Sequence, residues 1–504
     1  MPLTRVTGFG KAGLNKDVQP TLLAPGAWTV LDNIDIENGD VRSAWGDTAL
    51  ATTSPVVPTY TYAYTSFGIA GLLVSDGVDL YSYDDRTTPG SPDWRQVGGT
   101  YSGATGGIVT FTTFLGTLVI NFSEGNAYSW DPLQSSMAGL PAWLSSYHCK
   151  RIVSYRNFLF AIGMYDDNPN EAARHYPIDG DYTVAWSSAA AEGELPQEWR
   201  PSTTNLAGFV QLADTTGLLT NAAILRDDLV IYKDDCVYRC YFTGDEFIFN
   251  FERVIDDRGC DSQQGVASLS GVHFFSDRGD IRVFDGQNSQ SIVIDRIKSL
   301  LYPVVDNLSA SPVILRAWPD RDEIYVAVIP EGQTVADEVL VYSVDVDSWA
   351  VKQQFSTLSM TIVDAAGAAT LTGQTEEDRM LFGTPNNGLY LGDKSNTDAS
   401  GNPKVCTAER TGMVVEDLQQ QVTVRAVYPE ILGDATVQIS IGCLWQVNDP
   451  SIRWTAPQSF TPGVDKRINV RITGIPTAVR ITSEVDGSWR LGALSYLFSP
   501  AGSR

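Results

Sequence analysis

The chain has 504 residues, of which 43% are hydrophobic and 10% aromatic, and it contains 44 Gly and 25 Pro. It is too long for one ordinary core, so we expect two or three structural units or one large repeat domain. Lys and Arg number 35 against 60 Asp and Glu, a net charge of −25. This balance argues against a nucleic-acid-binding surface and against docking on an anionic membrane, because both need clustered Lys and Arg.

Two explanations of the acidic charge stay open. The charge keeps the protein soluble, or it makes the protein an acidic wall that nucleic acid passes without binding, since like charges repel. No window approaches 18 consecutive apolar residues, so no membrane-spanning segment is predicted. The first ten residues lack the apolar core of a secretory signal, so we expect synthesis and folding in a cytoplasm.

Residues 1–48 lack the repeat pattern of the central part of the chain and are predicted to form an N-terminal arm with a hairpin. Asn38 and Gly39 lie between the apolar residues Ile34, Ile36 and Val41, and an Asn-Gly pair in this setting is typical of a hairpin turn. The Pro-containing part before it is expected to extend over the protein surface or over a neighbouring subunit.

Residues 49–400 carry a weak repeat, in which a β-rich run and a Gly-containing turn precede an aromatic run and a closing Asp. Copies end at Asp84, Asp131, Asp285, Asp345 and Asp393, with 47 positions between the first two and 48 between the last two. A period of this size is typical of propeller blades, and the length allows about six or seven of them. Many short strands without helical windows also fit a closed propeller. Two ordinary β-sandwiches are the alternative.

The clearest part of the repeat is Leu229 to Gly286, which reads as two successive hairpins and predicts two neighbouring blades. A degenerate copy at 157–186 carries a polar insertion at 165–182. Residues 187–221 are expected to be loop-like. The apolar spacing over 291–305 predicts a short amphipathic helix that Pro303 ends.

After a polar linker at 395–403, residues 404–504 alternate between apolar and polar types. This pattern predicts half-exposed antiparallel strands, and we interpret the segment as a separate C-terminal β-sandwich module. The predicted fold class is therefore all-β, with an arm, a β-propeller-like domain and a sandwich-like module.

Only three histidines are available for catalysis or metal binding. His273 lies in an apolar strand and is expected to be a hydrogen-bonded core residue. His148 lies beside Cys149 but has no third ligand at a metal-binding spacing. His175 falls in the 165–182 insertion and is expected at the surface.

Paired aspartates suggest glycoside hydrolysis as one use, but they fall in predicted turns, where Asp caps its own backbone. The runs Asp345-Val346-Asp347 and Asp179-Gly180-Asp181 only partly match a calcium-binding loop. We therefore predict no catalytic, cofactor-binding or metal-binding residues, no cofactor and no enzymatic activity. The aspartate pairs lie at 84–85, 166–167, 227–228, 234–235 and 256–257.

Six cysteines are present and no Cys-x-x-Cys pair occurs, so a zinc ribbon or a thioredoxin-type motif is not expected. Cys236 and Cys240 are four positions apart on a predicted strand, which places them on one face, too far apart for an easy disulfide. We expect mostly buried free thiols at Cys149, Cys236, Cys240, Cys260, Cys406 and Cys443.

Scattered residues over roughly positions 10 to 290 resemble the tail nozzle, or tail tubular, proteins of short-tailed bacteriophages. None of the shared positions is catalytic. The N-terminal set comprises Gly13, Leu14, Asn15, Leu23–Trp28, Asn33, Asn38, Gly39, Arg42 and Gly46. The central set comprises Leu229–Lys233, Val237–Arg239, Tyr241–Gly244, Phe249, Phe251, Glu252, Gly259, Gly265–Ser268, Phe275, Ser276, Gly279 and Phe284–Gly286.

The resemblance implies a β-propeller protein of the virion tail that forms a homohexameric ring below the tail adapter protein. The ring would retain the genomic DNA and then conduct it during ejection, without sequence-specific binding, and fibre or spike proteins would dock on its flank. Such a ring closes by repeating one heterologous interface. We hypothesise that residues 1–48 and 404–504 together meet the adapter or neighbouring subunits.

Two other functions stay open. The chain is another virion component, such as a fibre or head-closure protein, or it is a stand-alone propeller that binds glycans or hydrolyses them. The second alternative predicts a monomer with a pocket on the propeller axis, lined by carboxylates or Trp. The 12 Trp of the sequence make sugar stacking conceivable, but Trp in strands is more simply explained as core.

Overall fold

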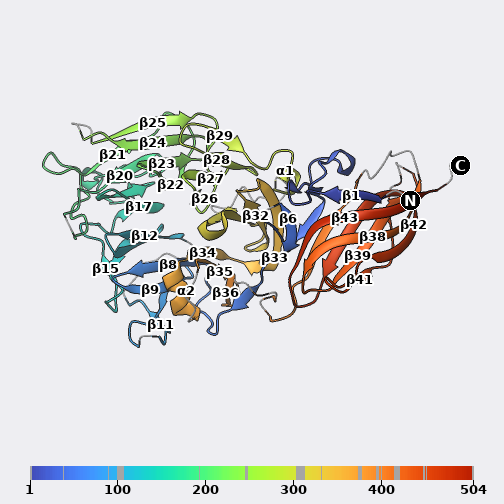
Figure 1. Cartoon of the computed structure of the whole chain (residues 1–504). Coiled ribbons are helices and arrows are strands. Elements are labelled where there is room, and N and C mark those ends of the chain that lie inside the picture. Colours follow the sequence, from blue (N-terminus) through green and yellow to red (C-terminus); the bar gives the residue numbers. More distant parts are fainter. Residues whose placement is uncertain are drawn as a thin grey trace.

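The computed structural model describes residues 3–37, 39–88, 90–98, 107–191, 193–244, 248–301, 313–330, 332–372, 377–392, 395, 397–398, 400–413, 421–446, 449 and 451–501. The molecule has two bodies side by side, a β-propeller and a C-terminal module (Figure 1). The predicted all-β fold class is confirmed, including the propeller and the sandwich-like module.

Six separate four-stranded antiparallel sheets form blades of the propeller within the described residues. The first blade consists of β8 (Tyr60–Ser66), β9 (Ile69–Ser75), β10 (Leu80–Asp84) and β11 (Asp93–Gln96). The second consists of β12 (Val109–Phe114), β13 (Thr117–Phe122), β14 (Ala127–Trp130) and β15 (Ala138–Gly139). The third consists of β17 (Arg151–Tyr155), β18 (Phe158–Ile162), β20 (Thr183–Trp186) and β21 (Gly208–Gln211).

The next two blades contain the stretch Leu229–Gly286, whose two predicted hairpins are the strand pairs β23–β24 and β27–β28. The fourth blade is β22 (Leu219–Leu225), β23 (Asp228–Lys233), β24 (Val237–Phe242) and β25 (Phe249–Ile255). The fifth is β26 (Val266–Leu269), β27 (Val272–Ser276), β28 (Ile281–Phe284) and β29 (Ser289–Ser291).

The last blade closes the ring with a strand from the other end of the chain. Its strands are β34 (Ser359–Val363), β35 (Arg379–Gly383), β36 (Leu389–Gly392) and β7 (Asp47–Ala49), in which β7 pairs antiparallel with β36. The boundary suggested at 48/49 therefore falls inside β7. The strand ties the start of the propeller to its end, so the ring is held by backbone hydrogen bonds as well as packing.

One further four-strand unit fills the ring between the fifth and the last blade. It consists of β30 (Val313–Trp318), β31 (Glu323–Val328), β32 (Ala336–Ser343) and β33 (Ser348–Thr357), and it is continuous with the sheet of the C-terminal module. Its first strand packs beside β26 and β34, and β34 packs beside β8. The innermost strands β8, β12, β17, β22, β26, β30 and β34 therefore follow one another around the axis.

The closing Asp of the repeat has a structural explanation. At Asp84, Asp131 and Asp285 the chain turns after the third strand of a blade, and the Asp carboxylate accepts backbone N–H groups of that turn, whereas Asp393 lies outside the described residues. Asp131 Oδ1 accepts from Leu133 N at 2.9 Å, and Asp285 Oδ1 accepts from Gln287 N at 2.8 Å. The short Asp side chain suits this role.

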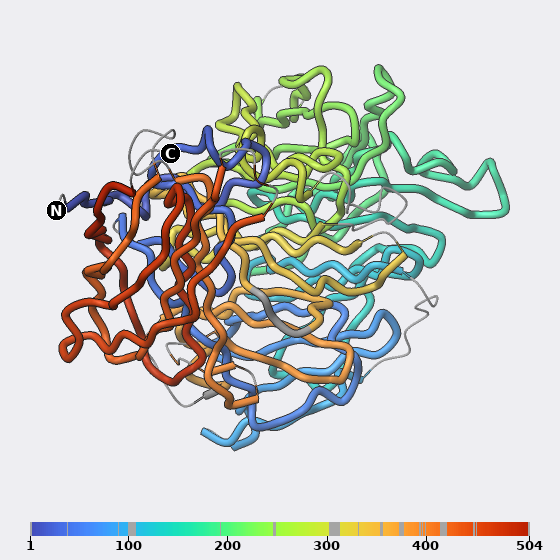
Figure 2. Tube along the Cα trace, turned by 90° about the vertical axis from the view of Figure 1, so that its right-hand side faces the viewer, coloured from blue at the N-terminus to red at the C-terminus, as the bar shows by residue number. Residues whose placement is uncertain are grey.

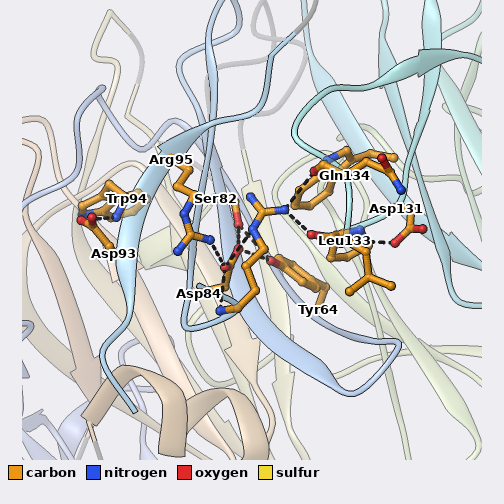
Figure 3. A network of polar contacts seen from close by, with 12 residues as sticks. Tyr64, Ser82, Asp84, Asp93, Trp94, Arg95, Asp131, Leu133 and Gln134 are labelled. Carbon is orange, nitrogen blue, oxygen red and sulfur yellow. Dashed lines mark hydrogen bonds and ion pairs between the residues drawn. The ribbon is translucent and has the colours of Figure 1, made fainter. Parts of the chain in front are cut away.

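Asp84 adds a contact between blades to this turn (Figure 3). Its buried carboxylate accepts from Tyr64 Oη at 3.0 Å and from Arg95 Nη1 at 2.7 Å, and it pairs with Arg86 at 3.2 Å. Arg86 Nη1 also donates to the carbonyl of Gln134 at 3.0 Å, in the turn that follows Asp131. The first blade is thereby linked to the second.

The C-terminal module, the red part of the chain at the left of Figure 2, has two sheets that share one long strand, β42 (Ile468–Ser483). The first half of β42 pairs with β38 (Val422–Gly433), and the second half with β37 (Cys406–Arg410) and β39 (Val437–Leu444). β42 thus changes sheets near Gly474. The remaining strands are β40 (Arg453–Trp454), β41 (Gln458–Phe460) and β43 (Trp489–Pro500).

The N-terminal arm is built into this module. β1 (Leu3–Thr7) pairs with β43, and the hairpin of β5 (Ile34–Glu37) and β6 (Asp40–Ser43) pairs with the same strand through β6. β4 (Val30–Asp32) lies between β37 and β33 and so joins the two bodies. The expected hairpin is confirmed, although Asn38 lies outside the described residues. The arm also contains β2 (Gly13–Leu14), the 3₁₀ turn η1 (Pro20–Leu22) and β3 (Ala27–Trp28).

Three local expectations need correction or a limit. The helix expected over 291–305 is α1 (Lys298–Leu301) only, and positions 302–305 lie outside the described residues. The segment 187–221 contains β21 and the start of β22, because it supplies the outer strand of the third blade. A second helix, α2 (Ala365–Thr372), lies in the last blade, where the sequence suggested none.

Four short elements complete the description. The insertion 165–182 contains β19 (Tyr165–Asp166), which pairs with β16 (Tyr147–His148), and the 3₁₀ turn η2 (Glu171–Ala173). A third 3₁₀ turn, η3 (Pro319–Arg321), joins β30 to β31. Among the described residues, no helix has the length and apolar character needed to cross a membrane.

Candidate functional site

The propeller axis contains a cavity of about 280 Å³. Its walls come from inner strands of several blades, so closure of the ring creates it. Three aromatic side chains contribute to the wall, and Tyr62 and Phe111 are stacked with ring centroids 5.4 Å apart. The lining residues are Tyr60, Thr61, Tyr62, Val109, Thr110, Phe111, Arg151, Gln263, Gln264, Val266, Arg316, Thr361 and Ile362.

Two arginines supply the charge of this axial cavity. Arg316 Nε donates to the carbonyl of Met360 at 2.8 Å, and its Nη2 donates to Gln264 Oε1 at 2.9 Å. Arg151 Nη1 donates to the carbonyl of Gln263 at 3.2 Å. Within the described residues neither guanidinium forms an ion pair, and no carboxylate lines the cavity. Both side chains are hydrogen-bonded only to neutral groups.

Burial changes the acid–base behaviour of these groups. Burial, and next the positive charge of Arg151, lowers the pKa of Arg316 to about 10. Burial also lowers the pKa of Arg151 and raises that of Tyr60. The lowered pKa values of Arg151 and Arg316 mean that a charged guanidinium is less stable in this cavity than in water. The two positive charges repel each other, and no carboxylate among the described lining residues offsets that repulsion.

Several buried polar atoms of the lining have no hydrogen-bond partner. They are Thr61 Oγ1, Thr110 Oγ1, Arg151 Nε and Gln263 Oε1. Thr61 and Thr110 are only 7% and 8% exposed. Each of these atoms is itself covered by its neighbours, so the two hydroxyls lie beneath the cavity wall and do not face the cavity.

A second polar cluster lies where the propeller meets the C-terminal module, around a cavity of about 260 Å³. Arg321 pairs with Asp35 of the arm at 2.7 Å and with Glu323 of β31 at 3.1 Å. The guanidinium groups of Arg42 and Arg321 both lie over the Trp45 ring, at 4.9 and 4.8 Å from its centroid. We call this group the junction cluster. Its opposite charges are paired, which is typical of a structural joint.

The junction cluster perturbs its own carboxyl groups. Burial, opposed by Arg321, raises the pKa of Glu323 to about 7. Burial also acts to raise the pKa of Asp35, but attraction by Arg321 and Arg42 outweighs it, so that pKa is lowered. Of the two acids that share Arg321, Asp35 therefore holds the negative charge more firmly.

The three histidines have different hydrogen-bonding surroundings. His273 is fully buried, and its Nδ1 lies 2.8 Å from Tyr232 Oη while its Nε2 lies 2.9 Å from the carbonyl of Ile224. Nε2 must donate to that carbonyl, so Nδ1 accepts from Tyr232, and the expected core role is confirmed. His175 is half-buried against Tyr147 Oη at 2.5 Å, and not at the free surface as expected. His148 Nδ1 contacts the carbonyl of Gly125 at 2.8 Å.

The paired aspartates mostly hold turns, as expected. Asp234 and Asp235 accept the backbone N–H groups of Leu218 and Gly217 at 2.9 and 2.8 Å. Within the calcium-like run, Asp347 instead pairs with Arg296 through both carboxylate oxygens. No group of three or more potential metal ligands occurs among the described residues.

All six cysteines are buried and free, as predicted. Cys236 and Cys240 contribute to the same hydrophobic cluster, which agrees with their predicted placement on one face. Burial raises the pKa of Cys236 to about 11 and that of Cys260 to about 12, so these thiols stay protonated at neutral pH. Protonated buried thiols behave as small apolar side chains.

Sequence reasoning did not identify Arg151, Arg316 or the two threonines of the axial cavity. Each lies in an ordinary β-rich run, and these residues come from four strands that are far apart in sequence. No spacing rule links such positions. The sequence offered one indication, which is that an Arg within a β-rich run is rarely buried unless a partner is present in the fold.

The ring of antiparallel sheets around an axial cavity defines a β-propeller protein with a sandwich-like second module. No protein-family model matches the chain, and no curated protein matches it. Among solved structures, a chain described as "Crystal Structure of Mitotic Checkpoint Complex" is similar at 9% identity and a TM-score of 0.40, covering 68% of this chain and 92% of that one. PorZ, a surface component of the type-IX secretion system of Porphyromonas gingivalis, is similar at 12% identity and a TM-score of 0.36, covering 82% of this chain and 46% of that one.

Proposed function

We propose that the chain is a structural subunit of the tail nozzle of a short-tailed bacteriophage. Copies assemble as a ring, expected to be hexameric, below the tail adapter, and the ring retains and then conducts the genome. The observation that carries the proposal is that both ends of the chain build one module. β1, β4, β5 and β6 are inserted among the C-terminal strands, and β4 and β33 join that module to the propeller.

This arrangement suits the wall of an assembly. Strand pairing and the junction cluster couple the two bodies, so a contact made by the module is transmitted to the propeller. The propeller axis itself holds a cavity of about 280 Å³, which is the size of a small-ligand site. A passage for nucleic acid would therefore have to lie between copies of the chain. The net charge of −25 suits a wall that does not retain DNA.

A stand-alone propeller that binds or cleaves glycans is the second candidate, and the axial cavity is the observation in its favour. Aromatic rings in the wall are suitable for stacking on a sugar. However, the described lining residues include neither a carboxylate nor a Trp, which this candidate requires at the axis. The buried Trp28, Trp130, Trp199, Trp318, Trp349 and Trp489 belong to the core. This candidate therefore has less support.

Electron-microscopic imaging of the full chain, alone and mixed with purified virion tail components, tests the proposal. A sixfold ring in either sample is the expected result. A ring that forms only in the mixture would mean that the adapter templates assembly. Single propellers in both samples would contradict the proposal and lead to a glycan screen.

Truncation of residues 1–48 is not a suitable companion experiment. It removes β4 and β7, which belong to the module and to the last blade, so the variant would lose its fold. Removal of residues 1–7 takes away only the edge strand β1, which makes it the better variant. Loss of the ring, with a native circular dichroism spectrum and melting temperature, would place β1 at the subunit interface. A normal ring would exclude it from that role.

A further inference from the structure

We propose that the axial cavity is a binding site for a phosphate-type oxyanion, either free or as the phosphate group of a small molecule. The inference does not rest on the proposed function. It is carried by the geometry of the cavity, in which the side chains of Arg151 and Arg316 line one space that no described carboxylate lines.

The charge of the cavity is the first argument. Arg151 and Arg316 bring two positive charges into a space that no described carboxylate lines, in a chain with a net charge of −25. Charges of one sign inside low-dielectric walls concentrate the electric field and attract counter-ions. An oxyanion placed here would offset the mutual repulsion of the two guanidinium groups.

The donors are the second argument. Guanidinium presents its N–H groups in a planar fork that matches the oxygens of phosphate. Arg151 donates to the carbonyl of Gln263 through Nη1, the one hydrogen bond of its side chain to the described residues, so Nη2 remains available as a donor. A tetrahedral anion with several acceptor oxygens can use donors from different walls at once.

The two arginines come from separate parts of the ring. Arg151 lies on β17 and Arg316 on β30, two inner strands that are not neighbours around the axis. The two arginines are fixed from behind by Gln263 and Gln264, which precede β26. A bound anion would therefore connect blades on opposite sides of the axis and stabilise the closed ring.

The melting temperature of R151Q separates ligand binding from folding. The substitution removes one of two positive charges that no described carboxylate of the lining offsets. A buried charge without an ion pair costs stability, so the melting temperature of R151Q without phosphate should not fall below that of the wild type.

The measurement is a calorimetric titration of the full chain with sodium phosphate, against sodium chloride at equal ionic strength. The wild type is expected to bind one phosphate saturably and chloride weakly. R151Q should lower the phosphate affinity at least tenfold, and R151K should restore only part of it, because Lys keeps the charge without the fork. R156Q, in the exposed turn between β17 and β18, is the matched control and should bind like the wild type.

A parallel titration with glycerol phosphate distinguishes free phosphate from a phosphorylated small molecule. Tighter binding of the ester would assign the site to a phosphorylated ligand, and tighter binding of inorganic phosphate to the free ion. Absence of saturable phosphate binding to the wild type would overturn the proposal. So would equal phosphate affinities of the wild type and R151Q. The titration of the wild type with phosphate and with chloride stands even if R151Q does not fold.

Discussion

Lys352 Nζ lies 2.8 Å from Asp47 Oδ1, and this pair joins β33 of the propeller to β7 of the N-terminal arm across 305 positions of sequence. Both side chains are almost fully buried, and Lys404 Nζ lies 3.6 Å from the other oxygen of Asp47. Burial lowers the pKa of Lys404 to about 8, which shows how costly an ammonium group is at this place. One carboxylate thus serves two buried lysines.

Replacement of Asp47 by Asn is expected to destabilise the protein by about 3–5 kcal/mol, because it leaves two buried ammonium groups without their anion. Urea unfolding, followed by circular dichroism, measures this loss. D40N is the control, since Arg490 and Asp40 form a more exposed pair, for which about 1 kcal/mol or less is expected. If the free energy of unfolding of D47N is within about 1 kcal/mol of the wild-type value, then Lys352 and Lys404 become neutral in the variant at little cost.

The E323Q variant should change how stability depends on pH. The pKa of Glu323 is raised to about 7 in the folded protein, from its ordinary value of 4.5. Between these pH values the folded state binds more protons than the unfolded state, so this group's contribution to stability falls as pH rises. We expect E323Q to gain roughly 1–3 kcal/mol over the wild type between pH 4.5 and 8.

Denaturant unfolding of both proteins at several pH values measures that difference. E252Q, a substitution of an exposed residue, is the control and should follow the wild type throughout. If E323Q and the wild type differ by a constant amount at all pH values, then Arg321 keeps Glu323 ionised in the folded protein and the pKa assignment is wrong.

His273 is expected to stay neutral well below pH 6. Burial lowers its pKa to about 4, whereas an unfolded His titrates near 6.5. The unfolded state therefore gains a proton first, and this group's contribution to stability is lost as pH falls from about 6.5 to about 4. Imidazole NMR signals report the titration directly, and only three histidines must be assigned. H273Q should remove the signal with the low pKa; persistence of that signal would assign it to another histidine.

Gly259 occupies a place where a side chain does not fit. A Cβ there would lie 2.0 Å from the carbonyl oxygen of Lys233, at the point where the fourth blade connects to the fifth. We expect G259A to cost about 1–3 kcal/mol through displacement of backbone. G139A is the matched control, because a Cβ at Gly139 meets no atom within 4 Å. Thermal unfolding compares the G259A and G139A variants. Equal melting temperatures would show that the connection between the fourth and fifth blades moves to accommodate the methyl group at no cost in stability.

The sequence alone determined the strands and their local pairing. Alternating runs, Asp-capped turns and the spacing of Asp84 and Asp131 predicted hairpins of blade size, because these features depend only on neighbours in the chain. The buried thiols and the role of His273 were also predictable, since an apolar strand leaves few other options for those side chains. The phage assignment stays a prediction, because it concerns partners that a single chain does not contain.

Only the tertiary structure decided where distant segments meet. Closure by β7, the insertion of the arm into the C-terminal module and the contact of Asp47 with Lys352 join positions more than 300 residues apart. No local pattern encodes such a choice, because many strand edges could pair equally well with β7. The axial cavity has the same origin. Arg151 and Arg316 converge on Gln263 and Gln264 only because the ring closes, and that closure is a property of all the blades packed together.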